Sequence, residues 1–259
     1  MKDQASTPTF GLEGRRVLVT GASSGLGRAI SIELSRHGAV LILVGRNRPA
    51  LEETQAALAA SPDHDILELD LRDQKQIYPR TREAVERQGP IYGFCHSAGV
   101  VDTRPLQATS RESIQAILDV NLLAGLEMAR VISRRDVLEA EGGSLLFISS
   151  IYALIGMPGE TAYSASKGAV LAAVRALAVE LARRRIRVNA LSPGFVRTAM
   201  TERALSKLSG EQAQAIIEAH PLGMGTPEDV ARAAAFLLAP VNGWITGTNL
   251  VIDGGFTAR

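Results

Sequence analysis

The sequence has little cysteine and little surplus charge. Cys95 is the single cysteine among 259 residues, which excludes an internal disulfide and favours a reducing compartment. The 28 basic and 27 acidic residues leave a formal net charge of +1. This balance gives no reason to expect nucleic acid or an anionic membrane as a partner. Separately, we expect no bound metal.

Long apolar runs are also absent. No run reaches the roughly 18 residues that a membrane helix needs. The first ten residues contain one basic residue, Lys2, and no continuous apolar core, so we do not expect a signal peptide. We expect residues 1–12 to form a flexible tail and the protein to be cytoplasmic.

What the chain does contain is enough apolar material for a large core. Hydrophobic residues make up 46% of the sequence, and the length suits one large α/β domain better than two small ones. No internal repeat, low-complexity tract or linker interrupts the chain. We therefore predict a single domain over residues 13–259.

Short apolar, β-branched runs alternate with longer amphipathic segments. Such alternation is typical of a doubly wound parallel sheet with helices on both faces, here a seven-stranded Rossmann fold. The predicted strands are Arg16–Thr20, Val40–Val44, Ile66–Asp70, Tyr92–His96, Ser144–Ser149, Ile186–Leu191 and Asn249–Ile252. The predicted helices are residues 25–37, 49–60, 74–88, 110–140, 162–184 and 227–238.

One insertion breaks this alternation, between the sixth strand and the last helix. It begins at Thr198 and reaches Gly225. Insertions after the carboxyl ends of parallel strands lie where ligands bind, so we predict a substrate lid at about residues 198–222. The alternative is a surface helical hairpin without a role in catalysis.

A glycine-rich turn follows the first predicted strand and opens a helix. Glycine permits a tight turn, and backbone amides at a helix N-terminus attract a pyrophosphate. The spacing differs from the commoner G-x-G-x-x-G pattern. Asp70 ends the third strand, where it would meet an adenine edge, and small residues end the fourth. The predicted dinucleotide site comprises Gly21, Ser23, Ser24, Gly25, Leu26, Gly27, Asp70, Ser97, Ala98 and Gly99.

The end of the second strand indicates which dinucleotide is bound. An NAD site generally places an acid there for the ribose 2′-hydroxyl, whereas an arginine accommodates the 2′-phosphate of NADP. This chain has Arg46, backed by Arg48, and lacks the acid. We predict NADP(H), the alternative being that Arg46 is a solvated loop residue.

Tyr163 and Lys167 lie four residues apart on a predicted helix, which places a phenol and an ammonium on one face. A phenol titrates near pH ~10, so it needs a nearby cation to exchange protons at neutral pH. Ser150 follows the fifth strand just upstream. This set suits proton donation to a substrate oxygen.

Together these residues resemble the single-domain short-chain dehydrogenases/reductases, from about Leu12 to Phe256. The resemblance implies that Ser150 binds the substrate oxygen, Tyr163 donates the proton, and Lys167 binds the nicotinamide ribose and lowers the tyrosine pKa. It implies that Asn121 holds a proton-relaying water and that Thr198 contacts the nicotinamide. The matching segments are Thr20–Gly27, Asp70-Leu71, Ser97-Ala98-Gly99, Asn121, Ser150, Tyr163-Ser164-Ala165-Ser166-Lys167, Ser192-Pro193-Gly194 and Asp253-Gly254-Gly255. By the same resemblance Leu71, Pro193, Gly194 and Val196 also border the cofactor.

The chain departs from the family at Ser97, where many members have an asparagine that braces the sheet. His96 precedes it and is either an additional acid–base group or, as we expect, a satisfied core residue. Arg183, Arg184 and Arg185, together with Arg187, resemble a basic patch at the end of a helix, where cations meet the negative dipole end, and we expect them to be solvated.

The expected activity is NADP(H)-dependent interconversion of a ketone and a secondary alcohol. The chain resembles 3-oxoacyl-[acyl-carrier-protein] reductases and broad-specificity carbonyl reductases most. A sugar or steroid-type hydroxy dehydrogenase, or a non-catalytic NADP-binding sensor, remains open. The expected substrate walls come from three segments. They are Ile151–Met157, with Leu154, Ile155 and Met157; Phe195; and the insertion over residues 198–222, with Met200, Leu205 and Leu208.

Two kinds of protein partner are expected. Arg197, Arg203 and Lys207 would meet an acidic carrier protein, unless they are ordinary surface charges. The resemblance also implies that the helix carrying Tyr163 and the helix over residues 121–133 pack against a second copy, in a homodimer or homotetramer.

Overall fold

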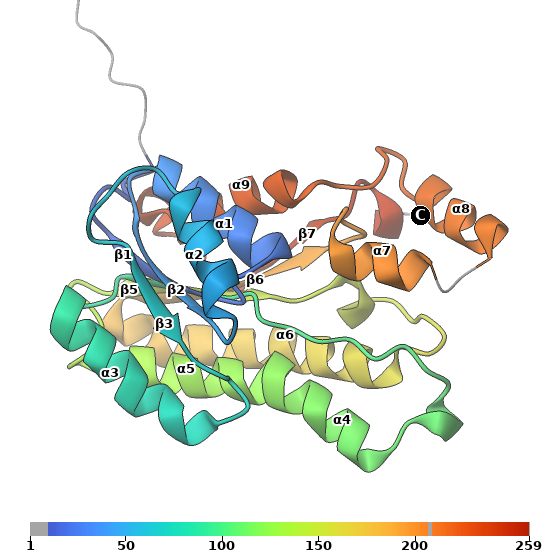
Figure 1. Ribbon diagram of the computed structural model, residues 1–259, viewed down its shortest axis with the longest axis horizontal. Helices are drawn as coiled ribbons and strands as arrows, with labels where there is room; N and C mark the ends of the chain where they lie inside the picture. Colours follow the sequence, from blue (N-terminus) through green and yellow to red (C-terminus); the bar gives the residue numbers. More distant parts are fainter. Residues whose placement is uncertain (1–9, 207–208, 259) are drawn as a thin grey trace, which may run out of the picture.

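A parallel seven-stranded sheet lies between two layers of helices (Figure 1). The computed structural model describes residues 10–206 and 209–258, and the strands follow one another in the order β3-β2-β1-β4-β5-β6-β7. The predicted Rossmann architecture is confirmed, and the strand order reverses between β1 and β4, where ligands bind in such sheets. The strands are β1 (Arg16–Thr20), β2 (Val40–Gly45), β3 (Asp65–Glu68), β4 (Gly93–His96), β5 (Gly143–Ile148), β6 (Ile186–Pro193) and β7 (Asn249–Ile252).

The helices cover both faces of the sheet (Figure 1). One face carries α1 (Gly25–Arg36), α2 (Arg48–Ala56) and α9 (Pro227–Leu238). The other carries α3 (Ile77–Gln88), α4 (Arg111–Leu118), α5 (Ala124–Ile132) and α6 (Thr161–Leu181). Short 3₁₀ turns occupy Gln74–Gln76, Leu106–Ala108, Ile151–Ala153, Ala182–Arg184, Pro240–Asn242 and Phe256–Ala258.

The strands form because their side chains are buried on both faces. Alternate residues face opposite helix layers, as the two-residue period of a strand requires. Leu18 and Ile42 pack in the cluster under α3, α5 and α6, whereas Val17 and Leu41 pack in the cluster under α1 and α9. Every residue of β6 is buried. This explains why continuous apolar runs located the strands correctly. Arg187 in β6, which we expected to be solvated, is therefore buried too, and its guanidinium donates to the carbonyl oxygens of Leu237, Leu238 and Ala239.

The long helix predicted over residues 110–140 is wrong in two respects. A π-helical segment, Asp119–Leu123, separates α4 from α5, and α5 ends at Ile132. The apolar pattern continued because Val137 and Leu138 are buried, but Leu138 forms an isolated bridge with Ile91 instead of a helical turn. Single π turns are frequent at functional sites, and this one carries Asn121.

The predicted tail ends earlier than residue 12. Residues 1–9 lie outside the described residues, but Phe10 stacks on His37 with ring centroids 4.5 Å apart. Leu12 is completely buried in the cluster under α1 and α9. Apolar side chains at this position therefore close the core.

The insertion after β6 forms two short helices, α7 (Ala199–Leu205) and α8 (Gly210–Glu218). They extend from the edge of the molecule at which the strands end (Figure 1). Lys207 and Leu208, for which we predicted roles, lie outside the described residues. Across the part of the chain that the structure describes, none of the helices is long and apolar enough to cross a membrane.

Candidate active site

The glycine turn between β1 and α1 is packed so closely that side chains cannot enter it. Gly21 adopts φ +68°, and a Cβ added there would lie 2.9 Å from Ala98 Cα. A Cβ added at Gly27 would lie 2.3 Å from the carbonyl oxygen of Gly21. These approaches leave a turn of bare backbone at the start of α1, as a pyrophosphate site requires.

The other predicted residues of the turn differ in exposure. Ser24 occupies the N-cap position of α1 but its side chain makes no capping hydrogen bond, so its hydroxyl is available to a ligand. Leu26 packs partly against the core. Arg28, which the sequence analysis did not select, donates to the backbone oxygen of Ser23 at 2.9 Å and pairs with Glu53. Arg28 therefore ties the glycine turn to α2.

Contacts link this turn to the candidate catalytic group. Gly21 packs on Ala98, and a Cβ at Gly99 would lie 3.5 Å from both Asn121 Oδ1 and Lys167 Nζ. On the other side, a Cβ at Gly25 would lie 3.9 Å from Thr198 Cγ2. The structure thus brings the turn, the end of β4, Asn121, Lys167 and Thr198 to one crevice.

Lys167 is buried and fixed at the end of β5. Its Nζ donates to the carbonyl oxygen of Ile148 at 2.8 Å and lies 5.6 Å from the ring centroid of Tyr163. Ser149 Oγ donates to the Lys167 carbonyl oxygen at 3.0 Å. Two contacts between β5 and α6 therefore set the position of the ammonium.

Ser150 lies two residues beyond β5 and is the N-cap of the 3₁₀ turn Ile151–Ala153. Its side chain accepts a hydrogen bond from the Tyr152 amide at 3.2 Å, which fixes the direction of the hydroxyl. Ser150 also forms a side-chain hydrogen bond that lowers the pKa of Tyr163. The hydroxyl and the phenol are therefore close enough to share one substrate oxygen.

Burial dominates the proton affinities of this group. It raises the pKa of Tyr163 to about 12, with a smaller rise from the Glu160 carboxylate, and lowers the pKa of Lys167 to about 8. We expected Lys167 to lower the tyrosine pKa, and the net shift has the opposite sign. Desolvation of the phenolate is the largest cause, and the group that lowers the pKa is the Ser150 hydroxyl.

Asn121 is completely buried on the π turn. Its Oδ1 accepts from the Val100 amide at 2.8 Å, and its Nδ2 donates to Val100 O and Ser166 Oγ, each at 3.0 Å. Ser166 Oγ in turn donates to the carbonyl oxygen of Tyr163 at 2.7 Å. Both amide protons are used, so only Oδ1 has a lone pair left for a water.

The adenine end of the crevice carries charged residues at the ends of β2 and β3. Arg46 is exposed, and its charge helps to lower the pKa of Asp70. Asp70 lies two residues beyond β3 and accepts from the Arg72 backbone and guanidinium. Arg72 is the larger cause of that shift, to a pKa of about 2. The sequence analysis missed this ion pair, although an acid and an arginine two residues apart were visible.

Several predicted cofactor residues contribute backbone only. Leu71 is buried in the core, and Pro193 pairs with Ile252 at the end of β6. A Cβ added at Gly194 would lie 2.9 Å from Asp253 Cα. Val196 is buried and forms an isolated bridge with Gly225. Their side chains cannot select a ligand.

His96 is a satisfied core residue, as we expected. Its Nδ1 lies 3.0 Å from Thr20 Oγ1 and its Nε2 lies 3.1 Å from the Val120 carbonyl oxygen. Burial lowers its pKa to about 4. Ser97 Oγ is buried without a hydrogen-bond partner among the described residues, so His96, and not Ser97, braces β1 against the π turn.

Aromatic side chains that the sequence analysis did not connect line the substrate end. Tyr152 meets the ring of Tyr163 edge-on, with centroids 6.1 Å apart, and meets Phe195 at 5.9 Å. Among the expected wall residues, Leu154 and Met200 are half exposed at 49% and 46%, as expected of residues at an open mouth. These contacts join two loops far apart in the sequence, so no local pattern indicated them.

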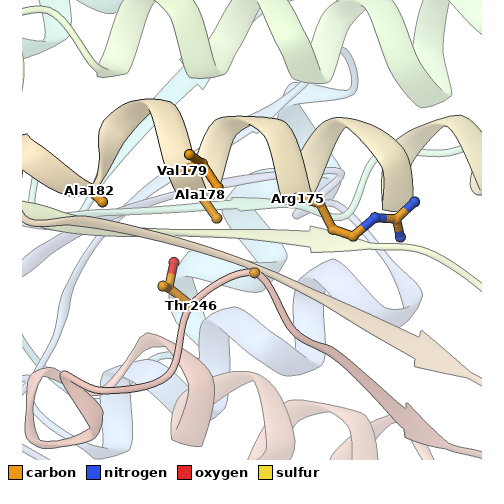
Figure 2. A pocket seen from close by; sticks show the side chains of 6 residues that line it. Arg175, Ala178, Val179, Ala182 and Thr246 are labelled. Atoms are coloured by element: carbon orange, nitrogen blue, oxygen red, sulfur yellow. The ribbon is translucent and has the colours of Figure 1, made fainter.

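A cavity of about 470 Å³ lies elsewhere, between α6 and the loop before β7 (Figure 2). Arg175, Ala178, Val179, Ala182 and Thr246 line it. Arg175 is eight residues beyond Lys167, or about 12 Å along the helix axis. This cavity is therefore separate from the candidate active site.

Comparisons with known proteins agree with this geometry. A family model described as Enoyl-(Acyl carrier protein) reductase matches residues 21–257. The 3-oxoacyl-[acyl-carrier-protein] reductase FabG of Thermotoga maritima is 32% identical over 94% of this chain and 98% of its own length. Levodione reductase of Leifsonia aquatica is 32% identical over 98% of both chains.

A solved structure agrees as well. The crystal structure of an NAD(P)-dependent gluconate 5-dehydrogenase from Beutenbergia cavernae, with NADP bound at low occupancy, is 32% identical to this chain. It superposes with a TM-score of 0.89 and covers 97% of this chain and 100% of that one. The protein therefore belongs to the short-chain dehydrogenase/reductase family, with relatives of the 3-oxoacyl reductase type, and is an oxidoreductase of CH–OH and C=O groups.

Proposed function

We propose that the protein reduces a ketone to a secondary alcohol with NADPH and catalyses the reverse reaction with NADP⁺. The observation that carries the proposal is the arrangement around Tyr163. The Tyr163 side chain is partly buried, and its phenol shares a hydrogen bond with Ser150. Lys167, which the Ile148 carbonyl oxygen holds in place, lies one helical turn further along α6. With a pKa of about 12, the phenol holds its proton at neutral pH, which is the state that a general acid needs.

The residues then have separate tasks. When bound, NADP(H) supplies or accepts the hydride. Ser150 holds the substrate oxygen, and Tyr163 donates a proton as negative charge develops there. Lys167, with its pKa of about 8, remains mostly charged at pH 7 and stabilises a nearby ribose and the phenolate. Asn121 fixes the start of α6 through Ser166 and offers Oδ1 to a relaying water.

The cofactor is NADP(H). The closely packed glycine turn fits a pyrophosphate, and exposed Arg46 lies where a 2′-phosphate would need a cation. The neighbouring structure with NADP bound supports the same assignment. Ser23 and Ser24 add hydroxyls at the same end.

The substrate is a 3-oxoacyl thioester or another apolar ketone. Relatives named 3-oxoacyl-[acyl-carrier-protein] reductase and levodione reductase support this range. A relative named gluconate 5-dehydrogenase keeps a sugar acid as the alternative. Exposed Arg197 and Arg203 near the mouth support a carrier protein as the form in which an acyl substrate arrives.

The assembly is a homotetramer built on two apolar surfaces. Val179 on α6 is 80% exposed and borders the cavity described above. Trp244 is 100% exposed and Val241 64% exposed beyond α9. Sedimentation equilibrium checks this assignment, and Trp244→Ser should halve the mass if the second surface joins two dimers. Because Cys95 is a buried free thiol, we place the protein in the cytoplasm.

The activity is tested by following NADPH oxidation at about 340 nm, where reduced nicotinamide absorbs. The substrates are a 3-oxoacyl thioester, a cyclic diketone and a ketogluconate, each with NADPH and with NADH. Turnover of the first two with NADPH is expected. Turnover of the sugar acid alone would replace the substrate assignment, and NADPH binding without any turnover would favour a sensor.

A further inference from the structure

Four aromatic rings form a continuous chain from the base of the lid to the candidate catalytic tyrosine. His220 lies 5.5 Å from Phe195 at 87°, Phe195 lies 5.9 Å from Tyr152 at 82°, and Tyr152 lies 6.1 Å from Tyr163 at 90°. Each contact is edge-to-face, the arrangement that aromatic quadrupoles favour. Tyr163 is the only member that the proposed chemistry uses.

His220 is the ring that ties this chain to the lid. It follows α8, is only 4% exposed, and uses both ring nitrogens. Nδ1 lies 2.8 Å from the Ile216 carbonyl oxygen in the last turn of α8. Nε2 accepts the amide hydrogen of Phe195 at 3.3 Å. The neutral ring with its proton on Nδ1 satisfies both bonds.

Phe195 and His220 lie at opposite ends of the lid in sequence. Phe195 precedes α7, and His220 follows α8. The two ends also pair through their backbones, since Gly225 N donates to Phe195 O at 3.0 Å and Arg197 N donates to Gly225 O at 3.0 Å. The side-chain bond from His220 therefore closes a loop whose ends already meet.

A third element holds the outer side of the His220 ring. Phe256, beyond β7, lies 4.6 Å from His220 and 6.0 Å from Phe195. Leu222 N donates to Gly254 O at 3.0 Å in the same region. The imidazole is thus clamped between the lid and the C-terminal segment.

We propose that His220 is a positioning residue for the substrate, because it holds Phe195 and, through Phe195, the Tyr152 ring against Tyr163. This inference rests on the proposed function. The wall beside the reacting oxygen then depends on α8 through two hydrogen bonds of His220 and three ring contacts. A bulky ketone, which needs the whole wall, depends on His220 more than a small one does.

Two substitutions separate the hydrogen bond to Phe195 from the bond to Ile216. Glutamine can place its Oε1 where Nε2 lies, and so keeps an acceptor for the Phe195 amide. Asparagine is shorter by one carbon and can reach only the Ile216 carbonyl. His220→Gln should therefore retain the positioning, whereas His220→Asn should lose it.

His64 provides a matched control on the other side of the molecule. It is also buried, accepts the Leu41 amide at 3.0 Å and lies 2.8 Å from the Ala59 carbonyl oxygen. Leu41 lies near the amino end of β2, away from the crevice. His64→Asn and His64→Gln report what the loss of such bonds does to stability alone.

The measurements are steady-state kinetics with a small and a bulky ketone, NADPH affinity by fluorescence, and amide hydrogen exchange of the cofactor-free protein. For His220→Asn we expect KM for the bulky ketone to rise about 10-fold or more, since small displacements of a positioned group cost up to about 100-fold. We expect NADPH affinity to be unchanged and exchange at Phe195 and in α8 to be faster. His220→Gln and the His64 variants should match the wild-type KM.

Several results would overturn the inference. Unchanged exchange in His220→Asn would mean that the bond does not hold the lid. Faster exchange with wild-type KM values, or equal KM increases in both His220 variants, would contradict a positioning role. If wild-type protein binds NADPH but reduces no ketone, the proposed function fails, and the exchange data still decide whether His220 holds the lid.

Discussion

The cofactor side and the substrate side of the crevice are held in different ways. On the cofactor side the backbone fills the space, and a Cβ at Gly27 would approach a carbonyl oxygen to 2.3 Å. On the substrate side the contacts are between side chains, and the ring centroids of Tyr152 and Phe195 lie 5.9 Å apart. Leu222, which follows α8, is 87% exposed.

This difference explains what each side can recognise. A turn of backbone amides binds the phosphates that every dinucleotide carries, so its geometry needs glycines at fixed places. The substrate wall consists of side chains from loops, and loops accept changes of sequence without loss of the fold. Cofactor class is therefore fixed locally, whereas substrate choice depends on contacts between distant segments.

The largest expected effect is a loss of turnover on the substrate side without a loss of cofactor binding. Tyr163→Phe removes the proposed proton donor but leaves the glycine turn and Arg46 in place. We expect turnover to fall about 10²- to 10⁴-fold, the contribution of a positioned general acid, while NADPH affinity changes less than about twofold. Steady-state kinetics and fluorescence titration measure the two quantities.

Tyr152→Phe is the control for that variant. It retains the edge-on ring contact with Tyr163 and removes a hydroxyl whose pKa burial raises. Turnover near the wild-type value is expected. If Tyr163→Phe kept wild-type turnover, or if Tyr152→Phe lost as much, the proton donor would have to be another group.

The next effect compares one substitution in the closely packed glycine turn and in open space at the start of α8. Gly27→Ala puts a methyl group against the Gly21 carbonyl oxygen, and overpacking of this kind costs about 1–3 kcal/mol or more. Gly210→Ala enters open space at the start of α8, where alanine is preferred to glycine by up to about 1 kcal/mol. Urea unfolding and NADPH titration should show loss for Gly27→Ala only. Equal behaviour of the two variants would contradict the comparison.

These two sides also differ in how much the sequence predicted. The strands, the glycine turn and the order of Ser150, Tyr163 and Lys167 were predictable because each depends on a local pattern or a short spacing. The π turn at Asn121 was not, because the apolar period runs through it. The aromatic contacts of Tyr152 were not, because they join the loop after β5 to the loop after β6.

The net shift in the pKa of Tyr163 could not be predicted, for a related reason. The spacing of Tyr163 and Lys167 indicated a cation near a phenol, and the structure has it, 5.6 Å from the ring. Burial was not visible in the sequence, and it dominates both groups. Spacing therefore predicts which groups meet, whereas the packing around them decides their proton affinities.

Acid should weaken the cofactor side through His96. Its pKa is about 4 in the folded protein and 6.5 when unfolded, so the unfolded state binds the proton first. The stability that neutral His96 contributes is complete above pH 6.5 and is lost as the pH falls towards 4, about 3 kcal/mol in all. Urea unfolding of wild-type protein and His96→Asn across this range measures it. An equally steep pH dependence in the variant would assign the loss to other groups.

The smallest effect concerns the outermost part of the cofactor side, the choice between NADPH and NADH. Arg46→Asp replaces a cation by an acid, so a 2′-phosphate loses a charged hydrogen bond, which contributes about 1.5–3 kcal/mol, or roughly 10- to 100-fold in affinity. NADH, which lacks that phosphate, should bind as well as before or better. Arg48→Asp is the control, because Arg48 pairs with Glu52 at 3.0 Å and is therefore turned along α2. Titration of NADPH and NADH into both variants measures the contribution of Arg46 to cofactor affinity. If Arg46→Asp kept its NADPH affinity, Arg46 would be a solvated loop residue.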